Sequence, residues 1–154
     1  MVEIFTDGAS RGNPGPGGYG TILKYGQHEK ELSGGYRKTT NNRMELLSVI
    51  VGLEALHKLN QEVIVYSDSK YVVDAVEKKW LLKWIKTGFK DKKNKDLWLR
   101  FCEVYNRHQV KFTWIKGHNG HPMNERCDVL AVRASQQLDL KVDVVYEAEL
   151  VYAK

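Results

Sequence analysis

Four acidic side chains stand at places in the sequence where they could act together on a metal ion. Asp7 follows an alternating apolar stretch, and Asp68 follows the nearly continuous apolar stretch in "EVIVYSDS". Glu45 and Asp128 each lie in the first turn of an expected helix. Carboxylates gathered at one place repel one another unless one is protonated or a cation is present. Their hard oxygen atoms suit Mg²⁺, with Mn²⁺ as a substitute, whereas soft-metal sites use cysteine and histidine.

Each of these acids also has a structural explanation that the sequence leaves open. Glu45 lies three residues after Asn42, which fits a capping box, and Asp68 could be a turn or N-cap residue. Asp128 could favour the dipole of its helix, and Asp7 could be an ordinary turn aspartate. The expected topology favours a shared site, because it brings all four acids to one edge of a sheet.

The elements that must position the acids follow from the hydrophobic pattern. Strands are expected over 2–6, 20–25, 29–36, 63–66 and 109–117. Helices are expected from about 40–42, from about 69, over 80–86, over 96–106, and from a cap at Asn124 to about 137. This order predicts an α/β fold with a mixed sheet and helices packed on its faces.

The expected crossover between the first and fourth strands carries the metal-site hypothesis. A strand reached through a crossover helix usually lies parallel to its sheet neighbour, with a right-handed connection. If 63–66 lies beside 2–6, their carboxyl ends meet, and Asp7 and Asp68 meet with them. Open sheets with helices bind ligands at such carboxyl ends.

Two histidines follow the last expected strand in "KGHNGHPMNE". His118 lies between that strand and the helix that carries Asp128. It is either a solvated loop side chain or a group that shuttles a proton beside the carboxylates near neutral pH. His121, which precedes Pro122, is the weaker candidate.

The positive charge of the chain is concentrated in one segment. The net charge is +5, yet residues 78–95 contain eight lysines and one acid and carry +7. Trp80, Trp84 and Phe89 lie among the lysines, and Trp98 follows them. The segment is either a solvated face with an inner aromatic stripe or a cationic surface for a polyanion, on which rings stack against sugars or bases.

Length and composition limit the remaining possibilities. A chain of 154 residues with 42% hydrophobic residues suits one domain, and we expect it over 1–138, with 139–154 as a tail of uncertain structure. No apolar run is long enough to span a membrane, and no signal peptide begins the chain, so we expect a cytoplasmic monomer that does not bind membranes. The two cysteines, Cys102 and Cys127, are expected to be reduced.

Six fragments in order, taken together, resemble the bacterial type 1 ribonucleases H. They are "FTDGAS", "GNPGPGGYG", "TTNNRMEL", "SDSKYV", "KWLLKW" and "KGHNGHPMNERCD", and the resemblance runs from Val2 to about Leu138. It implies the ribonuclease H-like fold, with a five-stranded mixed sheet and helices on both faces. It also implies an endonuclease that hydrolyses the RNA strand of RNA–DNA hybrids with two divalent ions and leaves 5′-phosphate and 3′-hydroxyl ends.

The resemblance assigns roles to individual residues. The four active-site carboxylates of the family match Asp7, Glu45, Asp68 and Asp128, and its catalytic-loop histidine matches His118. By the same analogy the RNA strand contacts Ser10, Asn13, Asn41 and Ser69, and the DNA backbone contacts Thr40, Asn42, Trp80 and Lys83. The glycines after Asp7 are expected to let backbone amides approach RNA.

Two positions depart from the family pattern. Lys70 stands where many bacterial relatives have glutamine, and Lys83 stands where an asparagine often helps to bind a DNA phosphate. Lysine keeps the affinity for phosphate but changes the geometry, so sequence preference or salt response is expected to differ.

Two other functions remain open from the sequence. One is a binding module for nucleic acid whose acids are only structural. The other is a nuclease of the same architecture with a different substrate, since integrases, transposases and junction resolvases share this fold.

Overall fold

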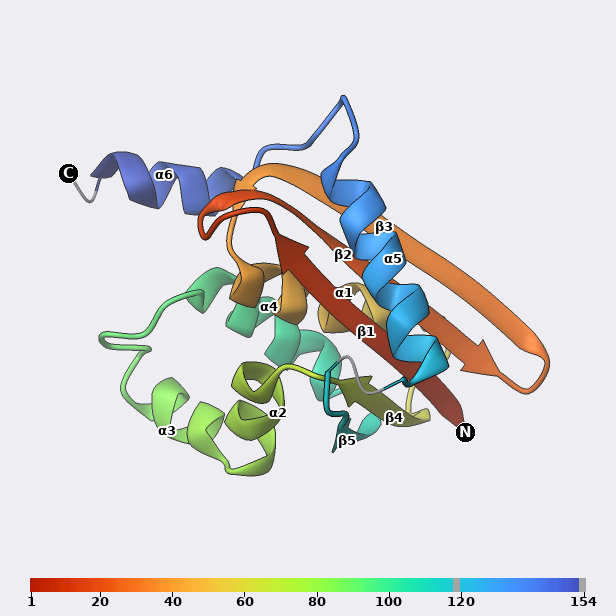
Figure 1. The fold of residues 1–154 in the computed structure, drawn as a ribbon. Coiled ribbons are helices and arrows are strands. Elements are labelled where there is room, and N and C mark those ends of the chain that lie inside the picture. The colour runs from red at the N-terminus through yellow and green to blue at the C-terminus, as the bar shows by residue number, and fades with distance from the viewer. Residues whose placement is uncertain (118–119, 153–154) are drawn as a thin grey trace.

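The computed structural model describes residues 1–117 and 120–152, which build an α/β fold on one five-stranded sheet (Figure 1). The strands are β1 (Val2–Ser10), β2 (Gly15–Tyr25), β3 (His28–Thr39), β4 (Glu62–Ser67) and β5 (Gln109–Trp114). The helices are α1 (Asn41–Glu54), α2 (Lys70–Glu77), α3 (Trp80–Lys86), α4 (Lys95–Tyr105), α5 (Pro122–Ser135) and α6 (Val144–Tyr152).

The sheet is mixed, as the order of elements predicts. Its strand order is β3-β2-β1-β4-β5. The first three strands form an antiparallel meander, whereas β4 pairs in parallel with β1, and β5 pairs in parallel with β4. The prediction that 63–66 lies beside 2–6 is therefore confirmed.

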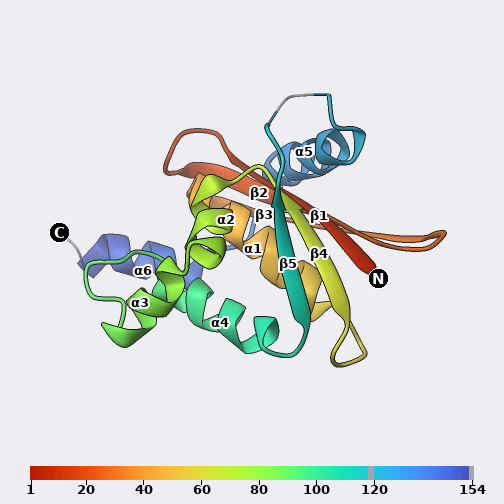
Figure 2. The same cartoon turned by 90° about the horizontal axis from the view of Figure 1, so that it is seen from below.

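Helices cover both faces of this sheet, which confirms the expected fold class. Figure 2 shows α5 on one face and α1 with α4 on the other. Ile4, Ile50 and Phe101 are fully buried between the sheet and α1 and α4. On the opposite face α5 packs so closely on β2 that a methyl group at Gly18 would overlap the backbone of Ala131. Glycine at this position therefore sets the distance between helix and sheet.

The first strand is longer than expected, and this changes the position of Asp7. The parallel ladder between β1 and β4 ends at the pair Phe5 and Tyr66, whereas the antiparallel ladder to β2 continues to Ser10. The prediction that the strand ends at Asp7 is wrong, because pairing with β2 keeps the chain extended for three more residues. Asp7 lies instead inside β1, two residues beyond its last pair with β4.

One helix cap lies in its predicted range and one does not. Thr40 caps α1, because its hydroxyl accepts a hydrogen bond from the Arg43 amide at 3.2 Å. Glu45 is thus in the second turn and closes no capping box. His121 caps α5 through Nδ1, which accepts from the Asn124 amide at 3.3 Å. Asn124 is therefore not the cap.

The residues after Leu138, which the sequence left unplaced, fold back along β3 and end in α6. The Arg37 amide donates to the Lys141 carbonyl at 2.8 Å, and the Lys141 amide donates to the Gly35 carbonyl at 3.0 Å. Beyond this bridge α6 extends away from the body of the molecule (Figure 1). Among the described residues, no helix has the length and apolar character needed to cross a bilayer.

Candidate active site

Three of the four predicted acids meet at one point. Asp7 of β1, Glu45 of α1 and Asp68, which follows β4, each place a carboxylate oxygen within 4.8 Å of the other two. We call these three residues the carboxylate cluster. They lie at the edge of the sheet where the parallel strands end, which is where such sheets bind ligands.

The strand register explains the meeting of Asp7 and Asp68. Phe5 and Tyr66 form the last pair of the parallel ladder, and each acid stands two residues beyond its member of that pair. Neighbouring strands lie about 4.8 Å apart, so side chains at equivalent positions on the same face of the two strands are held close together. The proximity of these acids therefore comes from the backbone.

Gly8 brings the third acid to the cluster. Its amide donates to Asp7 Oδ1 at 2.9 Å and to Glu45 Oε1 at 2.7 Å. A methyl group at this position would overlap the backbone of Met44 and Glu45. The sequence interpretation linked this glycine to the approach of RNA, whereas the structure shows that it allows β1 and α1 to touch.

Burial raises the pKa values of two acids of the carboxylate cluster, Asp7 and Glu45. Burial is the largest influence on Asp7 and raises its pKa to about 7; a hydrogen bond with Glu45 opposes the rise, and the charges of Asp68 and Asp128 add to it. The pKa of Glu45 is raised well above its usual range, first by burial and then by the charge of Asp7.

The acids of the cluster also offer oxygen atoms to a cation. Glu45 Oε2 is buried without a hydrogen-bond partner, and in the described part of the chain no basic side chain forms an ion pair with Asp7 or Glu45. An orphaned buried oxygen beside two further carboxylates is the donor set that a hard divalent cation takes. The residues present therefore fit the predicted metal.

The carboxylate cluster opens into a cavity that Asp128 also lines, although Asp128 is not a member of the cluster. It lies in the second turn of α5, and its charge reaches Asp7 and contributes to the raised pKa of that carboxyl. His118 lies outside the described residues. The described chain runs to Gly117 beside the cluster, where a Cβ would lie 3.0 Å from Asp68 Oδ2.

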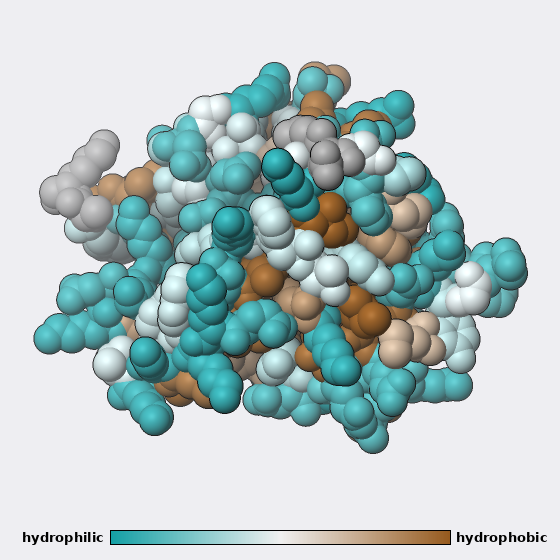
Figure 3. Space-filling view, turned by 60° about the horizontal axis from the view of Figure 1, so that its bottom comes forward, coloured by the Kyte–Doolittle hydropathy of each residue, from teal (hydrophilic) through white to brown (hydrophobic). Residues whose placement is uncertain are grey.

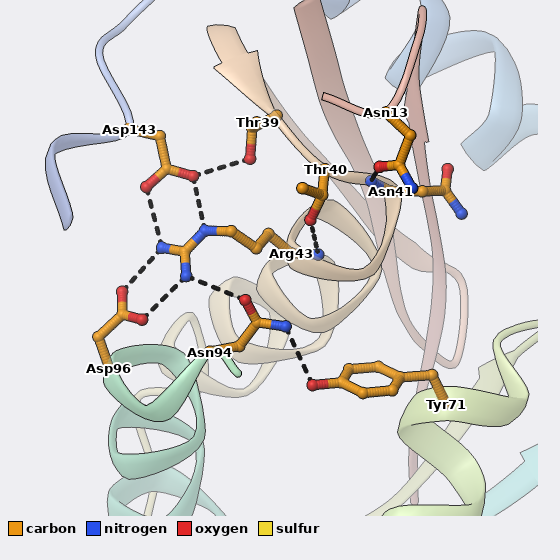
Figure 4. Close-up of polar contacts among 9 residues, drawn as sticks. All are labelled: Asn13, Thr39, Thr40, Asn41, Arg43, Tyr71, Asn94, Asp96 and Asp143. Carbon is orange, nitrogen blue, oxygen red and sulfur yellow. Dashed lines mark hydrogen bonds and ion pairs between the residues drawn. The ribbon is translucent and has the colours of Figure 1, made fainter. Parts of the chain in front are cut away.

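The predicted RNA contacts are placed around this cavity in different ways. Asn41 and Ser69 line it. Asn13 reaches it indirectly, because its Oδ1 accepts from the Asn41 amide at 3.1 Å (Figure 4). The Ser69 hydroxyl caps α2 by accepting from the Val72 amide, and Ser10 ends β1, half-buried, outside the lining of the cavity.

The predicted DNA contacts are divided between two places. Asn42 lines the cavity, and Thr40 stands next to it as the cap of α1. Trp80 and Lys83 lie on α3, outside the lining of the cavity, and both are exposed.

The lysine segment is a cationic surface, but most of its aromatic residues are not available to a ligand. All eight lysines of residues 78–95 are exposed. Trp98 is fully buried, Phe89 is buried, and Trp84 packs edge-on against Trp98 with ring centroids 5.7 Å apart. Trp80 is 39% exposed, with the Lys78 ammonium 5.3 Å from its ring centroid. Of the four aromatic residues, Trp80 is therefore the one whose ring is exposed. Figure 3 shows a surface dominated by hydrophilic side chains, with separate apolar patches between them.

The sequence interpretation missed a second charged cluster beside the cavity, formed by Arg43, Asp96 and Asp143 and called here the guanidinium cluster (Figure 4). Arg43 Nε lies 2.8 Å from Asp143 Oδ2, and Arg43 Nη2 lies 2.8 Å from Asp96 Oδ2. The Thr39 hydroxyl donates to Asp143 at 2.7 Å. The cluster joins the start of α1 to α4 and to the C-terminal segment. No short-range pattern links these three positions, so the sequence offers no signal for it.

Comparisons with known proteins agree with this geometry. The pattern of the RNase H family matches residues 1–136. A protein named Ribonuclease H from Rippkaea orientalis is 55% identical over 151 residues, covering 95% of this chain and 92% of its own. Ribonuclease H of Lachnoclostridium phytofermentans is 57% identical over 157 residues, covering 95% and 99%.

Solved structures of ribonucleases H are also similar to this chain. LC9-RNase H1, described as a type 1 RNase H with the type 2 active-site motif, superposes with a TM-score of 0.79 at 32% identity, covering 87% of this chain and 71% of its own. LC11-RNase H1, solved in complex with RNA/DNA hybrid, gives a TM-score of 0.66 at 25% identity, covering 87% and 96%.

Proposed function

Since the chain belongs to the ribonuclease H family, which hydrolyses the RNA strand of RNA–DNA hybrids, we propose that the carboxylate cluster and Asp128 are its catalytic centre. The observation that carries the proposal is the meeting of three carboxylates from β1, α1 and the end of β4 within 4.8 Å. The family match over 1–136 also supports our view that residues 1–138 form the catalytic domain.

The four acids would hold two divalent ions, preferably Mg²⁺. Asp7 and Asp68 would be the central ligands, Glu45 would complete one site, and Asp128 would complete the other. When bound, such ions lower the pKa of water and neutralise charge on the phosphate and the leaving oxygen. The protein keeps these oxygens in place through the Gly8 amide and the strand register.

The remaining residues would select and orient the substrate. Recognition of RNA must use the 2′-hydroxyl, the atom that DNA lacks, and we assign this contact to Glu45 of the carboxylate cluster. Asn13 and Asn41 would hold the RNA strand, and their mutual hydrogen bond supports a joint role. Ser10 and Ser69 are assigned to the same strand.

The DNA strand is assigned to the neighbouring surface. Thr40 and Asn42 lie at the start of α1, and Trp80 with Lys83 would extend the contact onto the exposed lysines of α3. His118 is assigned to proton transfer or product release at the cavity.

A cleavage panel tests this function. Labelled RNA–DNA hybrid, duplex DNA and duplex RNA are each incubated with Mg²⁺ and with EDTA. We expect cleavage of the RNA strand of the hybrid with Mg²⁺ alone and products with 5′-phosphate ends. An intact hybrid in both conditions would indicate a binding module, and equal cleavage of duplex DNA would indicate a different nuclease.

A further inference from the structure

Trp114 contacts the residues on both sides of Ser69 at the edge of the proposed catalytic centre. The residue ends β5 and is 42% exposed. Its indole Nε1 donates a hydrogen bond to the Asp68 carbonyl at 3.2 Å. The ammonium of Lys70 lies 4.7 Å from the centroid of the same ring. One aromatic side chain therefore holds both a carboxylate-bearing residue and a cation.

The backbone beneath this ring is fixed by the sheet. Trp114 forms the last pair of the parallel ladder with Ser67, and the Ile115 amide donates to the Ser67 carbonyl at 2.8 Å. The Asp68 carbonyl lies one residue beyond this pair, where β4 has ended and the strand no longer orients the peptide. The indole N–H supplies a donor at that point.

Lys70 stands where a polyanion would enter. It is the first residue of α2, lines the cavity that contains the carboxylate cluster and is exposed. A nucleic acid strand brings negative phosphates toward carboxylates that already repel them. Lysine binds phosphate as a compact point charge, and a cation at the face of an indole ring keeps N–H groups free for such a contact.

We propose that Trp114 is a positioning residue that orients Asp68 through its carbonyl and holds the Lys70 ammonium as a binding site for a phosphate of the strand being cleaved. This inference rests on the proposed function and adds a substrate contact to it. Lys70 supplies one ionic contact, and Trp114 fixes the place of that contact relative to the carboxylate cluster.

The salt dependence of KM on a labelled hybrid tests the role of Lys70. Lys70→Gln should raise KM on the order of threefold to tenfold at low salt and reduce the slope of log KM against log salt concentration by about 1, as loss of one phosphate contact requires. The effect on kcat should be smaller than the effect on KM. Lys70→Arg keeps the charge and should restore the slope.

Two substitutions of Trp114 separate its two contacts. Trp114→Phe keeps a ring for Lys70 but removes the N–H, so it should lower kcat while the salt slope stays near that of the parent. Trp114→Leu removes both contacts and should lower kcat and reduce the slope together. Combining Trp114→Leu with Lys70→Gln should reduce the slope no further than either change alone.

Lys58→Gln is the matched control, because it removes the same charge from an exposed site between α1 and β4, at the opposite end of the sheet. It should leave KM, kcat and the slope unchanged. Circular dichroism verifies that each variant is folded. If Lys70→Gln or Trp114→Leu has the same slope of log KM against log salt concentration as the parent, the inference is wrong, although the parent still cleaves the hybrid. Failure of the parent to cleave the hybrid would overturn the proposed function instead.

Discussion

The carboxylate cluster and the guanidinium cluster each contain one residue of α1, Glu45 and Arg43, which are two positions apart. The two clusters differ in how their charges are neutralised. Glu45 joins Asp7 and Asp68, and no ion pair in the described residues neutralises Glu45 or Asp7. Arg43 lies between Asp96 and Asp143, and its side chain is only 2% exposed. In the described part of the chain, Asp7 and Glu45 have no basic partner, whereas Asp96 and Asp143 share one.

The pKa values move in opposite directions in the two clusters. Burial raises the pKa of Asp7 and Glu45. Burial also acts to raise the pKa of Asp96, but its hydrogen bonds and charge interaction with Arg43 outweigh this and lower it below the usual value. A buried carboxylate is thus stable when the chain provides its counterion. Asp7 and Glu45 have no such counterion among the described residues, so their oxygens could hold an external cation.

The largest expected effect comes from removing one carboxylate from the first cluster. Asp7→Asn should lower the cleavage rate of the hybrid by roughly 10³-fold or more, because it removes a central ligand of the proposed ions. Binding of the hybrid, measured by fluorescence anisotropy, should remain. Substantial cleavage by this variant with Mg²⁺ would contradict the assignment of Asp7.

Removing Arg43 from the guanidinium cluster would leave Asp96 and Asp143 without their shared cation. Arg43→Met should destabilise the protein by about 3–5 kcal/mol, because Asp96 and Asp143 lose a buried counterion. Urea unfolding monitored by circular dichroism measures the change.

Arg37→Met is the control for that experiment, because Arg37 forms an exposed ion pair with Glu147 at 2.9 Å. It should lower the free energy of unfolding far less than Arg43→Met does, because an exposed ion pair contributes little to stability. Equal losses in the two variants would show that burial of Arg43 does not decide its contribution.

Adding a cation to the carboxylate cluster should stabilise it, as Arg43 stabilises the guanidinium cluster. Mg²⁺ at a hundred times its Kd should stabilise the parent by about 2.7 kcal/mol, measured as a rise in Tm. Asp7→Asn should show a much smaller rise in Tm on addition of Mg²⁺. Without metal at pH 7.5, its Tm should be higher than that of the parent, because one of several like charges is gone. A rise in Tm of equal size in both proteins would contradict a site at Asp7.

Apart from the control, the smallest expected effect is a loss of stability at acid pH that comes from the guanidinium cluster. The pKa of Asp96 is lowered by folding, so its contribution is complete above its ordinary pKa of 3.8 and is lost as the pH falls through the folded value. Asp96→Asn should therefore be less stable than the parent by roughly 2 kcal/mol near neutral pH. The difference should shrink below about pH 4. Urea unfolding across this pH range measures it, and a constant difference would be inconsistent with the lowered pKa.

The features predicted well from the sequence are those with a local physical signal. The period of the apolar residues identified α3 at its observed bounds of Trp80–Lys86, and the continuous apolar stretch identified β4. Helix caps were less predictable. Asn124 and His121 both precede the same apolar pattern, and the choice between them depends on which side chain turns toward the free amides of the helix.

The aromatic residues of the lysine segment show that composition and spacing do not predict which side chains are buried. Trp80 and Trp84 are four residues apart and equivalent in pattern, yet Trp84 packs against Trp98 while Trp80 remains exposed. Asp143 shows the same limit, because its partner Arg43 lies a hundred residues away. Such contacts depend on how α4 and the C-terminal segment pack against α1.

The sequence by itself determined the types of side chain available and the strands and helices that carry them, because hydrophobic period and local hydrogen bonding act over a few residues. It placed Asp7 and Asp68 after two strands expected to be parallel neighbours. Only the tertiary structure decided which charges share a counterion. Burial and distance set that balance, and both arise when segments far apart in the chain are brought into contact.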